Sequence, residues 1–395
     1  MSKYDDLFTA AANEDSVFID KGALDPLTEP DEIIARDPKE AELASILNGV
    51  NEGYLPPTVS IHGPPGTGKT LTTRRVCREF ASRHSDCAVE YVNLKECRTL
   101  FSAANEILLE VAGERKKAYE GLDGIFEGIW TTLEEYPEYT ILLLDEVDHI
   151  KHDSNYDVSD FFYRLLRGEG KLKRDITLSA WLISNQLIDV DLRLDSRVES
   201  AMGEESVYFG PYDMGRLDKL LHPRLEQGFR DGAVPDEVRS YGIREASKRW
   251  GDARKTISLF RNAGELANER GQARITKACI DDSLDATNKE ATLEKLKALP
   301  YNCLVVLSGM AFWRDKATGE IAKSVTTSEI VDATERIRPE SALGERAVRD
   351  VLRELETIGL VNTWIESRGQ GGRVKKCETT FDPEWIGQAL DQLKE

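Results

Sequence analysis

Residues 63–70 have the types and the spacing needed to hold phosphate groups. They read Gly-Pro-Pro-Gly-Thr-Gly-Lys-Thr, so the glycine at 68 is followed at once by Lys69 and Thr70. In such a P-loop (Walker A motif), glycines let backbone N–H groups curl around phosphates at the start of a helix. The lysine reaches the β- and γ-phosphates, and the threonine ligates Mg²⁺. We therefore predict binding of ATP or ADP with Mg²⁺ by Gly63, Pro64, Pro65, Gly66, Thr67, Gly68, Lys69, Thr70 and Leu71.

Two carboxylates follow the apolar run Ile-Leu-Leu-Leu at 141–144. Such a run predicts a buried strand that delivers a carboxylate to the C-terminal edge of a sheet, where the metal of a nucleotide would lie. We expect Asp145 to hold Mg²⁺ through water, and Glu146 to act as the general base that deprotonates the attacking water. A buried strand that ends in a solvated acidic turn has the same pattern. The preceding P-loop favours the catalytic interpretation.

Asn185 ends a further apolar run, and its amide could hydrogen-bond the attacking water or the γ-phosphate, although such residues often only form turns. Hydrolysis develops negative charge on the transferred phosphoryl group, so arginines are needed close by, from the same chain or a neighbour. Arg197 in Leu-Asp-Ser-Arg-Val and Arg254 in Gly-Asp-Ala-Arg-Lys are the candidates. Either could instead be a plain surface charge.

A parallel sheet is the structure that would bring these groups together. Short apolar or β-branched runs at 58–62, 88–93, 140–144, 178–184 and 205–209 are typical of buried parallel strands. Helical patterns, such as 71–80, separate them. This alternation predicts an α/β nucleotide-binding domain at 21–210, with a parallel five-stranded sheet covered by helices on both faces, after a polar leader at 1–20.

The pattern changes beyond residue 210. Amphipathic helices are expected at 217–229, 235–250, 252–270 and 276–296, which makes 211–298 a helical lid domain. Helices at 301–313, 327–337 and 341–359 then precede β-prone arms at 361–366 and 374–381, with a glycine-rich turn between them. Three helices and a hairpin predict a C-terminal winged-helix domain at 299–395.

Basic residues gather at this C-terminal end. On the helix 341–357, a rotation of 100° per residue places Val348, Val351, Leu352 and Leu355 in one arc, with arginines almost opposite. These arginines could simply pair with Glu345, Asp350 and Glu354. The hairpin adds more basic residues, and a basic glycine-rich tip can enter a minor groove or follow phosphates. The residues expected to bind DNA are Arg346, Arg349, Arg353, Arg368, Arg373 and Lys375, with Lys376 beside them.

Length and composition agree with a multidomain globular chain. Its 395 residues exceed the size of a single core, and no apolar stretch reaches the roughly 18 residues that span a bilayer. The N-terminal residues lack a secretory signal, and six scattered cysteines read as reduced thiols, so a cytoplasmic location is expected. The net charge of −19 lies almost wholly before residue 295, because 295–395 holds 15 basic and 16 acidic residues. Such acidity is also typical of adaptation to a salt-rich cytoplasm.

Taken in order, six motifs make the sequence resemble one family, the AAA+ replication initiators of archaea. This family is related to the largest origin recognition complex subunit and to the cell-division-cycle-six helicase loader, and the resemblance covers nearly the whole chain. The motifs are Pro-Asp-Glu-Ile-Ile-Ala-Arg-Asp at 30–37, Leu-Asp-Glu-Val-Asp at 144–148, Ile-Ser-Asn at 183–185, Asp-Ser-Arg-Val-Glu-Ser at 195–200, Tyr-Phe-Gly-Pro-Tyr at 208–212 and Gly-Asp-Ala-Arg-Lys at 251–255.

The resemblance implies roles for individual residues. Ile34 and Arg36 would lie beside the adenine pocket, and Tyr212 would also bind the nucleotide. Asn185 would be sensor one, and Arg254 would be sensor two. Arg197 would be the box VII arginine, with Arg193 as a nearby competitor. The family also inserts a helical element before the acidic motif, which would fall at 108–124, although an ordinary pair of sheet-covering helices fits that segment too.

The resemblance also implies a function: an initiator that binds double-stranded origin DNA through the winged helix and the insert, and helps recruit or load the replicative helicase. ATP would act as a switch with slow hydrolysis, and further copies or paralogues are expected partners, but not a membrane. The location would be cytoplasmic and nucleoid-associated, in a halophilic archaeon. The alternatives are a remodeller or clamp-loader-like ATPase with a winged helix that contacts proteins, and a regulatory paralogue that binds DNA weakly. His149 and His152 lack a third ligand and are expected to be surface residues.

Overall fold

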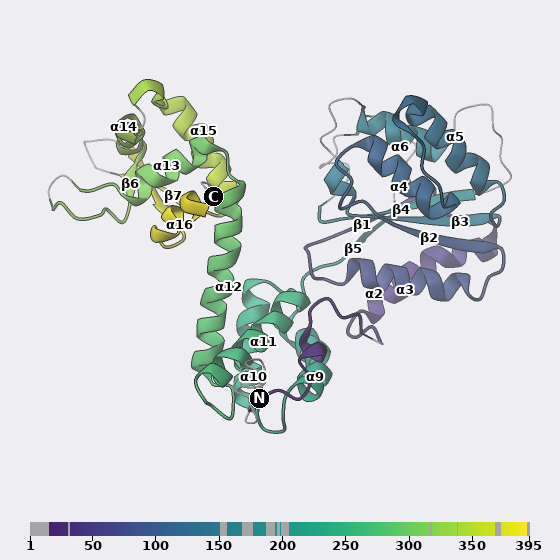
Figure 1. Cartoon of the computed structure of the whole chain (residues 1–395), viewed down its shortest axis with the longest axis horizontal. Coiled ribbons are helices and arrows are strands. Elements are labelled where there is room, and N and C mark those ends of the chain that lie inside the picture. The colour runs from purple at the N-terminus through teal and green to yellow at the C-terminus, as the bar shows by residue number, and fades with distance from the viewer. Residues whose placement is uncertain are drawn as a thin grey trace, which may run out of the picture. The chain divides into compact units, whose positions relative to one another are not determined.

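The structure is a computed structural model that describes residues 16–30, 32–150, 156–167, 177–186, 194–195, 198, 205–315, 318–337, 339–367 and 373–392. The chain divides into two compact units, Met1–Ile280 and Asp281–Glu395 (Figure 1). Within the described residues, no helix combines the length and the apolar character needed to cross a membrane.

The first unit is built on a sheet of five parallel strands in the order β2-β3-β4-β1-β5. The predicted parallel five-stranded sheet is therefore confirmed. Its register brings the last residues of β1, β3 and β4 to one edge, because His62 lies opposite Ser184 and Asp145 lies opposite Ile183. The strands are β1 (Thr58–His62), β2 (Cys87–Asn93), β3 (Tyr139–Asp145), β4 (Thr177–Ser184) and β5 (Ser206–Tyr208).

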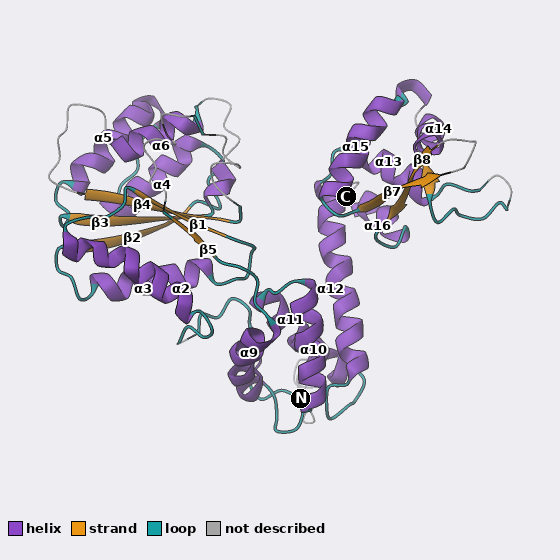
Figure 2. Cartoon of the chain, turned by 180° about the vertical axis from the view of Figure 1, so that it is seen from behind, coloured by secondary structure: helices purple, strands orange, loops and turns teal. Residues whose placement is uncertain are grey.

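Helices cover both faces of this sheet (Figure 2). On one face lie α4 (Leu100–Ala112), α5 (Gly121–Leu133) and α6 (Val158–Arg167), and on the other lie α2 (Asp37–Leu47) and α3 (Lys69–Ala81). Each face has its own apolar core, and every residue of the inner strand β3 is buried between the two. A strand enclosed in this way reads as a continuous apolar run, which is how it was visible in the sequence.

The segment 108–124, expected to be the inserted element, joins two of these helices. It comprises the end of α4, a 3₁₀ turn at Ala118–Glu120 and the start of α5. Both helices contribute buried side chains to the same core and contact each other. The other short 3₁₀ segments are Lys21–Leu24, Asn48–Glu52, Val147–Ile150 and Pro339–Ser341.

A helical lid completes the first unit, as the sequence predicted. It contains α9 (Met214–Gly228), α10 (Asp236–Arg249), α11 (Ala253–Glu269) and the beginning of α12 (Lys277–Ala298), which continues into the second unit.

The described part of residues 16–34, which we name the strap, runs from the lid toward α2 (Figure 1). The backbone N–H of Ile19 donates to the carbonyl of Gly228 at 2.8 Å, and the ring of Phe18 stacks on that of Phe229 with centroids 4.9 Å apart. The guanidinium of Arg224 donates to the carbonyls of Asp25 and Thr28. The strap is therefore fastened to the lid.

The second unit has its own core, formed by helices and a small antiparallel sheet of order β6-β8-β7. The helices are α13 (Tyr301–Ala311), α14 (Thr327–Ile337), α15 (Glu345–Thr357) and α16 (Glu384–Gln392), and the strands are β6 (Val325–Thr326), β7 (Val361–Ser367) and β8 (Arg373–Thr379). Three helices and the β7–β8 hairpin correspond to predicted elements. The two-residue strand β6 and the helix α16 were not predicted.

Candidate nucleotide-binding site

The P-loop joins β1 to α3 through three glycines in left-handed conformations. The φ angles of Gly63, Gly66 and Gly68 are +144°, +69° and +83°. Space is restricted as well as conformation: a Cβ on Gly68 would lie 2.9 Å from the hydroxyl of Tyr212, and a Cβ on Gly66 would overlap the carboxylate of Asp252. Only glycine fits these positions, which leaves the loop backbone open to close approach by phosphates.

Lys69 begins α3 and folds over the loop. Its ammonium donates to the carbonyl oxygens of Gly63 and Pro64, at 2.7 and 2.9 Å, and to Oδ1 of Asn185 at 3.3 Å. Burial lowers the pKa of this lysine, and the carboxylates of Glu146 and Asp145 oppose that shift. The result is a partly desolvated ammonium group at the centre of the loop, suited to phosphate oxygens.

Thr70 and Asp145 face each other across the end of the sheet. The Thr70 hydroxyl donates to the Asp145 carboxylate at 3.0 Å, and the backbone N–H of Glu146 donates to the same carboxylate at 3.0 Å. Among the described residues, no group of three or more His, Cys, Asp or Glu could hold a metal ion. Hydroxyl and carboxylate oxygens nevertheless suit Mg²⁺, which ordinarily completes its shell with phosphate oxygens and water. The residues present therefore fit a nucleotide-bound Mg²⁺.

Glu146 has an unusual backbone conformation for a non-glycine residue, with φ of +57°. Its Oε2 lies 3.3 Å from the amide nitrogen of Asn185 and 3.7 Å from Nε2 of His149. Asn185 thus contacts both Glu146 and Lys69. His149 has a side chain 42% exposed, whereas His152 lies outside the described residues.

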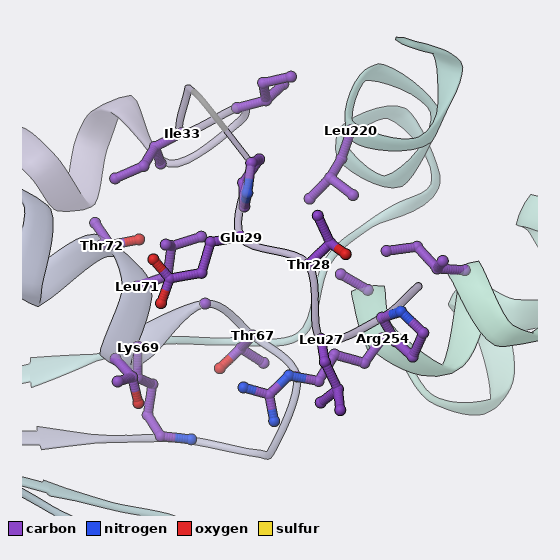
Figure 3. Close-up of a pocket in the computed structure, with 18 of the residues that line it drawn as sticks. Leu27, Thr28, Glu29, Ile33, Thr67, Lys69, Leu71, Thr72, Leu220 and Arg254 are labelled. Atoms are coloured by element: carbon purple, nitrogen blue, oxygen red, sulfur yellow. The ribbon is translucent and has the colours of Figure 1, made fainter. Parts of the chain in front are cut away.

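These groups line one cavity of about 580 Å³, within the range of small-molecule sites. Strap, P-loop, strand ends and lid all contribute to its wall. Figure 3 shows Arg254 extending from the lid past Thr67 toward the side on which Lys69 lies, with Leu220 of α9 and Leu27 of the strap also at the wall. The predicted residues that line it are Ile34, Pro65, Gly66, Thr67, Gly68, Lys69, Thr70, Leu71, Asp145, Glu146, Asn185, Tyr212 and Arg254.

Arg36 packs against this wall instead of lining the cavity. Its side chain is buried, donates to the carbonyl of Gly210 at 3.0 Å, and stacks over the ring of Tyr212 at 3.7 Å. The preceding residue, Ala35, has φ of +63°, a turn that directs the chain toward this contact. Arg36 therefore supports Tyr212, which does line the cavity. Arg197 and its competitor Arg193 lie outside the described residues.

Some residues at the site were missed from the sequence. Asp252 caps α11 by accepting from the backbone N–H of Lys255 at 3.0 Å, and the N–H of Ala253 donates to the carbonyl of Gly66 at 3.1 Å. Burial raises the pKa of Asp252. An aspartate just before a helical run is a capping signal that could have been used here. Tyr91, which contacts Asp145, gave no such signal, because its role depends on strand order.

In the second unit, the two faces predicted for α15 are present. Val348, Leu352 and Leu355 are buried, Val351 is half-buried, and the three arginines Arg346, Arg349 and Arg353 are exposed. Two of them have acidic partners: Arg349 pairs with Glu345 at 2.7 Å and Arg353 pairs with Asp350 at 3.0 Å.

The hairpin carries the other predicted basic residues. Lys375 lies 3.8 Å from Glu356, and Lys376 is half-buried. Arg373 is the first residue of β8, and Arg368 lies outside the described residues. Exposed apolar side chains lie on the opposite arm, where Trp364 pairs with Lys376 and Ile365 pairs with Lys375.

The parallel sheet, the P-loop after β1, the acidic pair after β3 and the arginine-bearing lid together define an AAA+ ATPase module. Comparisons agree: residues 59–205 match the model of the ATPase family associated with various cellular activities (AAA), and residues 218–284 match that of the Cdc6 AAA+ ATPase-type lid domain. In its ATPase module and its lid, the chain is similar to the Cdc6/ORC1-type AAA+ replication initiators. This confirms the resemblance drawn from the motifs.

Relatives match over most of the chain. The ORC1-type DNA replication protein 1 of Methanosarcina mazei is 28% identical over 387 residues, which cover 96% of this chain and 92% of that protein. The ORC1-type DNA replication protein 4 of Halobacterium salinarum is 28% identical over 361 residues, covering 88% and 85%. Among solved structures, the Aeropyrum pernix ORC1 protein in complex with DNA has a TM-score of 0.73 at 25% identity, covering 96% of this chain and 98% of that chain.

Proposed function

We propose that this chain is an ATP-dependent replication initiator that binds double-stranded origin DNA and helps recruit or load the replicative helicase. The observation that carries the proposal is that one chain holds a P-loop cavity and a separate unit in which three arginines are exposed on one helix. We assign 21–210 to nucleotide binding, 211–298 to the lid and 299–395 to a winged-helix DNA-binding domain, after the leader at 1–20. The DNA complex of the similar Aeropyrum pernix ORC1 protein supports this division.

The first step is nucleotide binding. Lys69 and the glycine-rich backbone would neutralise and cradle the phosphates, and Tyr212 and Ile34 would contact the base side of the nucleotide. Thr70 and Asp145 would hold Mg²⁺, which supplies positive charge to the phosphate oxygens when bound. Arg254 would bring the lid helix α11 to the phosphates, so the lid position would depend on the nucleotide.

Hydrolysis would use Glu146 as the base. Its carboxylate accepts a proton from water as the water oxygen bonds to the γ-phosphorus, and the bond to the bridging oxygen breaks to release ADP. Asn185 orients that water, and Arg254 stabilises the developing negative charge, with Arg197 assigned a similar role from this chain or a neighbour. We propose slow turnover, so that ATP and ADP mark two states of a switch.

Nucleotide binding and turnover are tested by separate substitutions. Lys69→Ala should abolish equilibrium binding of a fluorescent ATP analogue, whereas Glu146→Gln should keep binding and lose phosphate release by about 100-fold or more. Lys248→Ala is the matched control, because Lys248 is an exposed lysine of the lid. Normal turnover by Glu146→Gln would show that another group is the base.

DNA binding would use α15 as the recognition helix and the β7–β8 hairpin as the wing. Arg346 lies exposed on α15, and the ion pairs of Arg349 and Arg353 are exposed, so exchanging their carboxylates for phosphates costs little. The wing adds Lys375 and Lys376, together with Arg368 and Arg373. Residues 108–124 would make a second contact, with Tyr119, 82% exposed, near the tip.

Charge reversal tests this interface. Arg346→Glu should weaken duplex binding and flatten the dependence of log affinity on log salt by about one unit, without changing ATP affinity. Arg83→Glu is the control, because Arg83 is likewise an exposed arginine but belongs to the AAA+ module. The double variant Arg368→Glu/Arg373→Glu tests the wing in the same assay. Unchanged duplex affinity in both variants would remove the second unit from the DNA interface.

The pairing of Arg349 and Arg353 favours one competing function, a remodeller or clamp-loader-like ATPase whose winged helix contacts proteins, because it partly neutralises the basic face. A regulatory paralogue with weak DNA binding is the related case. Chromatin immunoprecipitation with sequencing separates these functions. An initiator gives sharp occupancy at an origin, such as one beside its own gene, while a flat genome-wide profile would exclude that function.

A further inference from the structure

Tyr91 links the acidic pair to the rest of the nucleotide cavity. It lies on β2, beside β3, and its hydroxyl donates to Oδ2 of Asp145 at 2.8 Å. The side-chain amide of Asn93 donates to the same hydroxyl at 3.3 Å. Because a hydroxyl has only one proton, a donor from Asn93 leaves that proton directed at Asp145. Tyr91 is thus a fixed hydrogen-bond donor to the carboxylate that faces Thr70.

The ring of Tyr91 is held in turn from α3. The guanidinium of Arg74 lies over the ring, 4.2 Å from its centroid, and its Nη1 is 3.1 Å from Oε1 of Glu29. Glu29 belongs to the strap and lines the same cavity as Asp145. A continuous set of contacts therefore runs from Asp145 through Tyr91 and Arg74 to Glu29, joining two walls of one cavity.

We propose that Tyr91 is a positioning residue that fixes the Asp145 carboxylate for Mg²⁺, and that Arg74 holds the tyrosine ring in place. The inference rests on the proposed nucleotide function of the site. Asp145 is 4% exposed and accepts from Thr70, Tyr91 and the backbone of Glu146, so its carboxylate has one well-defined orientation. Removing one of these donors loosens that orientation without altering the charge.

Tyr91→Phe tests the proposal, because it removes only the hydroxyl and keeps the ring under Arg74. The readout is equilibrium binding of a fluorescent, non-hydrolysable ATP analogue, first in EDTA and then at rising Mg²⁺. Affinity in EDTA should stay within about twofold of the parent. The Mg²⁺ concentration that gives half of the Mg²⁺-dependent gain in analogue affinity, the Mg²⁺ midpoint, should rise about tenfold. A loss of metal affinity of about this size is usual when a group that orients a metal ligand is removed.

Tyr136→Phe is the matched control. The Tyr136 hydroxyl also donates to a carboxylate, Glu90 at 3.0 Å, and Tyr136 is likewise half-buried, but Glu90 does not line the cavity, whereas Asp145 does. Tyr136→Phe should change thermal stability about as much as Tyr91→Phe does, and it should leave the Mg²⁺ midpoint unchanged. Arg74→Ala should raise the midpoint about threefold, as expected for the loss of a cation–π contact.

An unchanged or lower Mg²⁺ midpoint in Tyr91→Phe, with normal binding in EDTA, would overturn the proposal. If both tyrosine variants raised the midpoint equally, the effect would be general destabilisation, and the proposal would also be wrong. A midpoint unchanged in Arg74→Ala would remove Arg74 from the proposal. Failure of the proposed nucleotide function looks different: the parent itself would then bind the analogue no better than Lys69→Ala.

Discussion

The contact between the P-loop and the lid can be tested by adding one methyl group. Gly66 has φ of +69°, and a Cβ there would overlap the carboxylate of Asp252, the residue that caps α11. Gly66→Ala must therefore displace either the loop or the first turn of the lid helix that carries Arg254. We expect both stability and ATP affinity to fall.

The magnitude follows from what the displacement breaks. Alanine at a left-handed position costs about 1–2 kcal/mol wherever it occurs. Moving Asp252 would add the loss of a helix cap, about 1 kcal/mol, and the hydrogen bond from Ala253 to Gly66 would add about another 1 kcal/mol. Gly113 is the matched control, because it has φ of +70° and nothing within 4 Å of an added Cβ. Gly66→Ala should therefore cost about 2 kcal/mol more than Gly113→Ala.

The assay is urea unfolding of both variants, with binding of a fluorescent ATP analogue measured on the folded proteins. In the double variant Gly66→Ala/Asp252→Ala, the added methyl meets no carboxylate. Measured against Asp252→Ala alone, Gly66→Ala should then cost no more free energy of unfolding than Gly113→Ala. Equal destabilisation by Gly66→Ala and Gly113→Ala, with ATP affinity retained, would refute the reasoning. It would mean that the lid does not rest on the loop in solution.

Two further predictions concern the lid and the strap. Asp252→Asn should raise the melting temperature at pH 7. Burial raises the pKa of Asp252, so the parent protein loses stability as the pH rises from about 4 toward that raised pKa. Below about pH 4 the carboxyl group is protonated in both the folded and the unfolded state, and the stability gained by Asp252→Asn should vanish. A gain that is the same at every pH would contradict this assignment. Phe18→Ala removes the ring that stacks on Phe229, a change worth about 3–5 kcal/mol in a core, so amide exchange in the strap should accelerate by at least tenfold. Ile19→Ala, at a side chain 69% exposed, is its control, and equal exchange in both variants would show that Phe18 does not anchor the strap.

Local sequence patterns were enough to predict the parallel sheet and the P-loop. The bounds expected for the first strand, 58–62, are those of β1, because its apolar run stops at the glycine that opens the P-loop. Buried strands such as β3 show a continuous apolar run, and α14 has the bounds expected from its amphipathic period. The strand β6 was missed because it is only two residues long, too short to alternate.

Contacts between segments that are distant in the chain could not be predicted from local sequence patterns. Residues 16–20 of the strap were expected to belong to a polar leader, yet Phe18 packs on Phe229, 211 residues later in the chain. Tyr91 contacts Asp145 only because β2 and β3 are neighbours in the sheet, and the sequence of neither strand indicates the strand order. Arg36 was expected beside the nucleotide, and its burial under Tyr212 depends on the turn at Ala35.

Among the described residues, only Ala35 and Glu146 have positive φ without being glycine. For Glu146 this conformation costs about 1–2 kcal/mol that glycine would not incur. Laboratory evolution toward heat resistance alone would therefore favour the loss of this glutamate. Such a screen would enrich thermostable variants that still bind ATP but no longer turn it over, and selection would have to score hydrolysis as well to avoid them.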